Sequence, residues 1–345
     1  WTRPDRVSCH PQSGIWKSTD AGRDNAGLVA TAMERPKEKT MTQGDPDCIF
    51  RGLSAFPITP SHPDGRVDVE RLYRLLSRLR QAGVDSVGLL GSTGTYAYLS
   101  RTERRRAVEA AVECLDGRVP LIVGVGALRT DEAEALARDA EAAGADGLLL
   151  APVSYTQLLD EEVFRHFQSV ARASGLPVCI YNNPSTTHFT FGPALIERLS
   201  EVPGIVALKN PAPASVEVPA EIDGLRARLP EGFSIGYSGD WNCAAALLAG
   251  GDAWYSVVAG LLPDPALRLT RAAQAGNRSE VERLDWLFRP LWDLFREFGS
   301  LRVMYAAAEV LGVSDLPPPR PILPISAANR DRVAGALHAL GTDRA

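Results

Sequence analysis

The chain has 345 residues, of which 45% are hydrophobic and 23% are charged, and its formal net charge is −5. This mildly acidic balance gives no support for nucleic acid or a membrane surface as a partner. No apolar run approaches the roughly 18 residues that would suggest a membrane span. The five cysteines are scattered and the five histidines form no ligand pattern. We therefore expect free thiols, a cytoplasmic location and no metal site.

The first part of the chain differs from the rest. Residues 1–44 are polar, hold three of the four lysines and show no helical or strand period. We expect a disordered N-terminal extension there. The remaining chain is interpreted as a barrel at 45–277 and a C-terminal helical extension at 278–345 that packs on the barrel.

From residue 48 short apolar strands alternate with amphipathic helices. Strands are predicted at 48–58, 85–90, 120–125, 146–150, 177–181, 205–209, 233–237 and 252–257. Helices are predicted at 68–81, 100–115, 130–143, 160–173, 193–200, 216–228, 240–249 and after Pro263. Asp68 is expected to cap the first helix, and Ser100 with Glu103 to form a capping box on the second. Eight strand-then-helix units predict an α/β fold, a closed (β/α)8 TIM barrel. Three more helices are predicted from 279 to 340.

One stretch, residues 204–211, has the pattern of a buried strand that ends in a lysine. Lys209 is the only lysine from residue 40 onward, although the chain has 37 lysines and arginines in all. Strand alternation predicts that Ile205 and Ala207 share the face of Lys209. A buried lysine is costly unless it has a function, and unlike arginine it can become a neutral amine nucleophile. We interpret Lys209 as a Schiff-base lysine; the alternative is a strand-end cation that snorkels to solvent.

Active sites of such barrels lie at the carboxyl ends of the strands. The predicted strand ends place an amine, Lys209, and a phenol, Tyr181, at this face, and the loop after the second strand adds Ser92, Thr93 and the amides around Gly94. These groups suit imine chemistry on a 2-oxo acid. The amine attacks the ketone, the phenol moves protons, and the loop binds the carboxylate. A core tyrosine and an ordinary turn are the alternative interpretations.

These residues lie in motifs that resemble those of the dihydrodipicolinate synthase / N-acetylneuraminate lyase family, in matching order from about residue 50 to the C-terminus. The motifs are Gly91-Ser92-Thr93-Gly94, Tyr181-Asn182-Asn183-Pro184, Leu208-Lys209, Ser238-Gly239-Asp240 and Gly251-Asp252-Ala253-Trp254-Tyr255-Ser256. The resemblance implies a class I aldolase-type enzyme, a homotetramer, with no metal or organic cofactor. It assigns the imine to Lys209, the proton relay to Tyr181, and carboxylate binding and relay to Ser92 and Thr93. It also implies that Gly239 and Tyr255 line the site with backbone groups.

Two positions depart from the pattern of the synthase. Where the synthase has an arginine that holds the second substrate's carboxylate, this chain has Thr186, which is expected to line the substrate pocket. Where the synthase lends a tyrosine across its dimer, Ser154 aligns and Tyr155 follows. The second substrate therefore stays open.

Three hypotheses follow. The leading one is a lyase or synthase that acts on pyruvate or a related 2-oxo acid through a Lys209 imine, by aldol chemistry or by dehydration. The second is a true dihydrodipicolinate synthase (4-hydroxy-tetrahydrodipicolinate synthase) that tolerates Thr186. The third, from another class, is a non-catalytic barrel that senses a 2-oxo acid and forms no reducible adduct.

Overall fold

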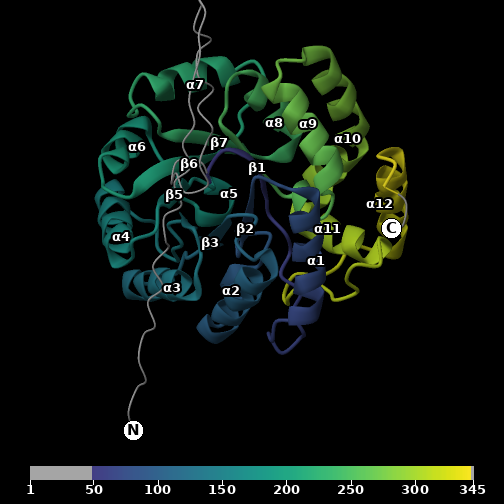
Figure 1. The fold of residues 1–345 in the computed structure, drawn as a ribbon, viewed down its shortest axis with the longest axis horizontal. Coiled ribbons are helices and arrows are strands. Elements are labelled where there is room, and N and C mark those ends of the chain that lie inside the picture. The colour runs from purple at the N-terminus through teal and green to yellow at the C-terminus, as the bar shows by residue number, and fades with distance from the viewer. Residues whose placement is uncertain (1–48, 343–345) are drawn as a thin grey trace, which may run out of the picture. The chain divides into compact units, whose positions relative to one another are not determined.

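A computed structural model of the protein describes residues 49–342, and eight parallel strands in it close into a barrel in the order β1 to β8 (Figure 1). The last strand, β8, pairs with β1 and completes the ring. The strands are β1 (Gly52–Ala55), β2 (Ser86–Leu89), β3 (Leu121–Gly124), β4 (Gly147–Leu150), β5 (Val178–Tyr181), β6 (Ile205–Pro211), β7 (Ser234–Ser238) and β8 (Ala253–Ser256). The predicted TIM barrel is confirmed. The extension predicted at 1–44 lies outside the described residues.

Helices follow the strands and surround them (Figure 1). They are α1 (Val69–Ala82), α2 (Arg101–Leu115), α3 (Thr130–Ala143), α4 (Asp160–Ala173), α6 (Pro193–Ser200), α7 (Val218–Arg226), α8 (Asp240–Leu248) and α9 (Pro263–Gln274). Three short elements were not predicted: the helix α5 (Pro184–Thr187) and the 3-10 turns η1 (Tyr96–Tyr98) and η2 (Val258–Gly260). All three follow the carboxyl ends of strands, so they shape the face that carries the candidate site.

The predicted C-terminal helical extension is present as α10 (Arg278–Phe298), α11 (Ser300–Val310) and α12 (Ala327–Ala339). Helix α10 packs on α8 and α9, and α12 packs on both α10 and α11. The extension therefore lies against one side of the barrel (Figure 1). The boundaries predicted at 44/45 and 277/278 stay predictions. No helix within residues 49–342 combines the length and the apolar character that crossing a membrane requires.

The apolar core has two layers, one between strands and helices and one inside the barrel. On β6 the predicted alternation fails at one position. Val178 of β5 pairs with Ile205, whereas the next residue, Cys179, pairs with Ala207, so Val206 is an extra residue that bulges out of the ladder. Ile205 consequently packs in the outer layer, whereas Ala207 lies inside the barrel. The prediction that Ile205 shares the face of Lys209 is wrong, because the bulge shifts the alternation.

The two helix caps predicted from the sequence had different outcomes. Asp68 caps α1, because its carboxylate accepts the N–H of Arg71 at 2.9 Å. The capping box on α2 is only half formed. Ser100 Oγ accepts the N–H of Glu103 at 3.3 Å, but the Glu103 carboxylate accepts the N–H of Val67 at 2.8 Å rather than that of Ser100. A long-range bond therefore replaces the expected local one.

Candidate active site

The amine and the phenol of the predicted site stand on adjacent strands. Tyr181 is the last residue of β5, and its backbone pairs directly with Lys209 of β6. Strand β6 continues to Pro211, two residues beyond the predicted end at Lys209, because Pro211 still pairs with Ser238 of β7. The side chains of Lys209 and Tyr181 lie inside the barrel near its carboxyl end, where they are only 3% and 5% exposed, respectively.

Three aromatic rings surround the amine of Lys209. Its Nζ lies 3.7 Å from the ring centroid of Phe56, 4.2 Å from that of Tyr181 and 5.7 Å from that of Tyr255. No acidic side chain among residues 49–342 forms an ion pair with it. Each ring presents negative π density, so the cage attracts a positive charge on this nitrogen. A cationic imine at the same nitrogen receives the same attraction.

The hydroxyl of Tyr181 belongs to a short polar chain. Its oxygen lies 3.0 Å from Oγ of Ser92, and it accepts a bond of 2.9 Å from Nδ2 of Asn183. The phenol is therefore positioned by the loop after β2 on one side and by the segment after β5 on the other. A positioned hydroxyl beside an amine is the arrangement that proton transfer requires.

The loop that carries Ser92 is bracketed by two residues in the left-handed region. Leu90 has φ of 57° and Thr95 has φ of 53°, values that cost non-glycine residues energy. Between them, a Cβ at Gly94 would lie 3.0 Å from the backbone of Leu90, so any larger residue there would be tightly packed against this turn. The tight turn brings the Ser92 hydroxyl over the end of β2 and toward Tyr181.

A second polar chain runs behind the site. Nδ2 of Asn182 donates to Oδ1 of Asn210 at 2.7 Å, and Nδ2 of Asn210 donates to the Glu221 carboxylate on α7 at 2.9 Å. Asn182 follows Tyr181 and Asn210 follows Lys209, so these side chains point away from the barrel interior. The chain locks the relative position of the two strand ends that carry the phenol and the amine.

Two buried titratable groups near Lys209 have strongly shifted pKa values. Burial raises the pKa of Asp240 to about 6, against the lowering effect of bonds from the N–H of Val258 and Nε1 of Trp254 and of the positive charge on Lys209. Burial also raises the pKa of the Cys179 thiol to about 12. Because only a thiolate is nucleophilic, Cys179 does not compete with the amine.

The other predicted site residues differ in burial and in the elements on which they lie. Thr93 is buried at 4% exposure beside Ser92. Gly239 has φ of 84° and precedes the first turn of α8. The ring of Tyr255 is completely buried inside the barrel, where its hydroxyl accepts a long bond from the Cys179 thiol. Thr186 is exposed on α5, and its hydroxyl donates to the carbonyl of Asn183 at 3.3 Å. The roles predicted for these residues stay predictions.

Sequence reasoning missed Phe56, whose ring lies closest to Lys209. The interpretation of 48–58 as one strand concealed it, since β1 ends at Ala55 and Phe56 therefore stands at the carboxyl end. It also did not assign Asn183 a bond to Tyr181, although the residue was part of a quoted motif. A shorter first strand, in line with the other predicted strands, would have placed Phe56 among the candidates.

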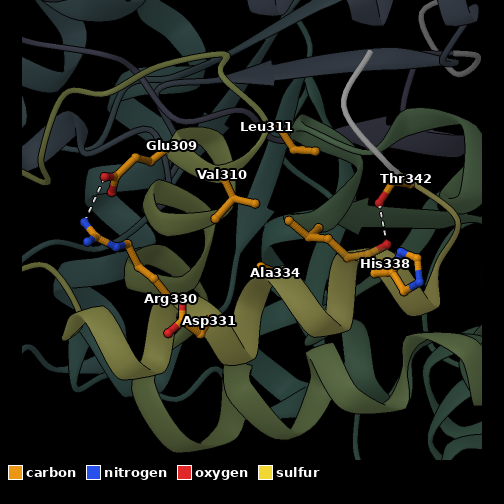
Figure 2. A pocket seen from close by; sticks show the side chains of 9 residues that line it. Glu309, Val310, Leu311, Arg330, Asp331, Ala334, His338 and Thr342 are labelled. Carbon is orange, nitrogen blue, oxygen red and sulfur yellow. Dashed lines mark hydrogen bonds and ion pairs between the residues drawn. The ribbon is translucent and has the colours of Figure 1, made fainter.

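A cavity of about 460 Å³ lies elsewhere, on the C-terminal extension between α11 and α12 (Figure 2). Its charged lining is partly paired, because Arg330 donates to Glu309 at 2.8 Å. It does not adjoin Lys209 or Tyr181, so the site is assigned to the barrel end on chemical grounds. Among residues 49–342 no group of three or more His, Cys, Asp or Glu side chains gathers as a metal site.

Comparison with known proteins adds four findings. The profile of the Dihydrodipicolinate synthetase family matches residues 49–340. The 4-hydroxy-tetrahydrodipicolinate synthase of Methylococcus capsulatus is 37% identical over 295 residues, which cover 85% of this chain and 99% of that protein. The crystal structure of a dihydrodipicolinate synthase from Agrobacterium tumefaciens is 61% identical, with a TM-score of 0.85 and coverage of 86% of this chain and 100% of that one. A Thermotoga maritima dihydrodipicolinate synthase is 25% identical, with a TM-score of 0.80 and coverage of 85% and 99%.

Proposed function

Since the chain belongs to the dihydrodipicolinate synthetase family and is a lyase of that family, we propose that it acts on pyruvate or a related 2-oxo acid through a Schiff base on Lys209. One observation carries the proposal: a buried amine without an ion-pair partner among the described residues stands directly beside a hydrogen-bonded phenol on the next strand. A buried lysine without a carboxylate partner is expensive unless the neutral amine is used.

In the proposed reaction the lone pair of the neutral Lys209 amine forms a bond to C2 of the acid. The carbonyl oxygen leaves as water with the two amine protons, and protonation of the C=N bond then gives the iminium. The Tyr181 hydroxyl passes these protons, positioned by Ser92 and Asn183. The iminium withdraws electrons from the neighbouring carbon, so a carbon–carbon or carbon–oxygen bond can be made or broken there. This chemistry calls for no metal and no organic cofactor.

The carboxylate of the acid is proposed to bind at the loop after β2. The hydroxyls of Ser92 and Thr93 and the backbone amides near Gly94 supply neutral donors there. Gly239 and Tyr255 are proposed to line the site on the β7 and β8 side. Preorganised donors of this kind stabilise a carboxylate without a second cation. A second cation near Lys209 would compete with its amine for the three aromatic rings.

The test is borohydride reduction of the full-length protein with pyruvate, followed by peptide mass spectrometry. A reduced adduct is expected on Lys209, with Lys17, Lys37 and Lys39 as internal controls that stay unmodified. Lys209→Ala should abolish both adduct and turnover. No adduct with pyruvate or with a wider set of 2-oxo acids would favour the sensor hypothesis, and near-full turnover by the alanine variant would contradict the imine.

The second candidate is 4-hydroxy-tetrahydrodipicolinate synthase activity, favoured by the names of the curated relatives. Against it stands Thr186, which offers a hydroxyl already bonded to Asn183 where the resemblance calls for an arginine. Expression in a strain that requires diaminopimelate separates the two. Rescue would establish the synthase, and failure with well-folded protein would leave an aldol or dehydratase reaction with another second substrate.

The proposal extends to a homotetramer in the cytoplasm. Support comes from the family resemblance and from apolar side chains on loops after β2, β3 and β4: Tyr98, Leu128 and Tyr155 are 44%, 65% and 98% exposed. The free buried thiols of Cys114 and Cys179 fit a reducing compartment. Sedimentation velocity at micromolar concentration should give a tetramer, and cell fractionation should recover the protein with cytoplasmic markers; a monomer or a membrane-bound fraction would contradict these points.

A further inference from the structure

The first two turns of α2 carry four arginines, and one of them differs from the others. Arg101, Arg105 and Arg106 are exposed, and each forms an ion pair with a carboxylate. Arg104 lies on the inward face of the helix and is only 7% exposed. No acidic side chain in the described part of the chain forms an ion pair with it. A buried guanidinium of this kind is costly unless other groups satisfy it.

The guanidinium of Arg104 joins two loops at the carboxyl end of the barrel. Its Nε donates to the carbonyl of Tyr96 at 2.9 Å, in the loop after β2. Its Nη1 donates to the carbonyl of Gly126 at 2.9 Å, in the loop after β3. Its Cζ lies 5.0 Å from the ring centroid of Tyr96, and a Cβ at Gly126 would lie 3.3 Å from that ring. Arg104, Tyr96 and Gly126 therefore form one packed unit that ties the two loops together.

Tyr96 directly follows the turn that carries Ser92. The carbonyl of Ser92 accepts the N–H of Thr95 at 3.1 Å, which closes this turn. Thr95 has φ of 53°, a conformation that costs a non-glycine residue energy and persists only where the surroundings enforce it. Strand β2 anchors the start of the turn through its pairing with β3, and Arg104 anchors its end. The turn thereby keeps the Ser92 hydroxyl 3.0 Å from that of Tyr181.

We propose that Arg104 is a positioning residue of the active site, which holds the turn after β2 where Ser92 meets the Tyr181 hydroxyl. It acts through the turn and not on the substrate. This inference rests on the Schiff base proposed above. A planar guanidinium presents several donors at fixed angles, so it can hold the carbonyls of two different loops at once. A lysine ammonium is a compact charge on a flexible stem and does not replace that fork.

The experiment measures the rate at which saturating pyruvate is trapped on Lys209, at a borohydride concentration that no longer limits this rate. Arg104→Ala should slow trapping about 10- to 100-fold, because a misplaced catalytic group can cost that much. Arg104→Lys keeps the charge but loses the fork, so its rate should lie between those of the wild type and the alanine variant. Arg105→Ala is the matched control at the next position of α2. It should trap pyruvate at the wild-type rate, because Arg105 pairs with Glu109 on the surface.

Ser92→Ala separates positioning from a general effect on the structure. If Arg104 acts by placing Ser92, its loss matters little once that hydroxyl is gone, so Arg104→Ala should slow the Ser92→Ala variant by less than about 3-fold. Where the alanine variant does not fold, Arg104→Lys completes the same double-mutant cycle. Factors that multiply in full, or Arg104 variants that trap pyruvate at the wild-type rate, overturn the inference and leave the Schiff base intact. Absence of any adduct in the wild-type protein overturns the proposed function itself.

Discussion

The two ends of the barrel hold their charged groups differently, and at the amino end three aspartates bind backbone N–H groups while two of them also pair with arginines. Asp85, Asp146 and Asp252 each stand immediately before a strand and accept a backbone N–H from the neighbouring strand, those of Leu53, Leu121 and Ile235 at 2.7–2.8 Å. Arginines join two of the three: Arg271 pairs with Asp85, and Arg51 and Arg226 pair with Asp252. These contacts fasten the starts of the strands.

The carboxyl end leaves its polar groups incompletely paired. Lys209 has aromatic rings in place of a carboxylate, and Asp240 has backbone and indole donors in place of an arginine. Oδ1 of Asn182 and the hydroxyls of Thr59 and Thr95 are buried without a hydrogen-bond partner. Buried polar atoms without a partner also occur outside this end, at Arg78, Ser86 and His166, so the difference between the two ends rests on Lys209 and Asp240. One end of the barrel supplies stability and the other supplies reactivity.

The largest effect expected from this division is on catalysis. Tyr181→Phe removes the hydroxyl between Ser92 and Asn183 and leaves the ring over Lys209 in place. We expect kcat to fall about 10²- to 10⁴-fold, because a positioned proton donor contributes that much, while the unfolding midpoint changes little. Steady-state kinetics and urea unfolding measure both.

The control for this variant is Tyr305→Phe. Tyr305 is equally buried, and its hydroxyl reaches the carbonyl of Thr59 at 3.4 Å rather than the amine cage. Its kcat should stay within a few-fold of wild type. If Tyr181→Phe also kept kcat within about 10-fold of wild type, the phenol would not be the proton relay. The proposed division between a stabilising amino end and a reactive carboxyl end would then rest on Lys209 alone.

The sequence predicted the reactive pair because the pair depends on order alone. Tyr181 and Lys209 end consecutive strands of a parallel barrel, so they must meet, whatever happens elsewhere. The bulge at Val206 was not predictable from alternation, since it arises from pairing with β5. The ring of Phe56 was not predictable either, because its position depends on space left by Gly88 and Gly91 on another strand. Chain order thus predicts which residues meet, while packing decides what surrounds them.

At the amino end the expected effect is on stability. Asp252→Asn removes the charge that binds Arg51 and Arg226, while the amide oxygen can still accept the N–H of Ile235. Charge-assisted bonds contribute more than neutral ones, so we expect a loss of about 2 kcal/mol in the free energy of unfolding with kcat unchanged. Urea unfolding and steady-state kinetics test this directly.

Asp146→Asn is the matched variant at the same end. Asp146 accepts the N–H of Leu121 and forms no ion pair within residues 49–342. Its loss should be smaller, about 1 kcal/mol or less. Equal losses in the two variants would show that the arginines add nothing, and a fall in kcat for Asp252→Asn would break the separation between the two ends.

The last effect is confined to acidic pH and concerns Asp240, the buried carboxylate at the carboxyl end. In the unfolded chain it releases its proton near pH 3.8, but in the folded protein burial holds the proton until about pH 6. Between these values the folded state binds more protons than the unfolded state, so the free energy of unfolding falls as the pH rises. The slope is at most about 1.4 kcal/mol per pH unit. The free energy of unfolding should be measured across this window for the wild type and for Asp240→Asn. The wild-type value minus the variant value should fall as the pH rises to about 6 and stay constant above it.

Lys209→Ala sharpens the same measurement. The positive charge of Lys209 lowers the pKa of Asp240 in the folded protein, so its removal should raise that pKa and extend the upper end of the window to higher pH. If the pH dependence of this difference in unfolding free energy stayed the same, the two groups would not interact electrostatically. A window that extends would show that the amine and the carboxylate interact without a direct ion pair, whereas the aspartates Asp85 and Asp252 of the amino end contact their arginines directly.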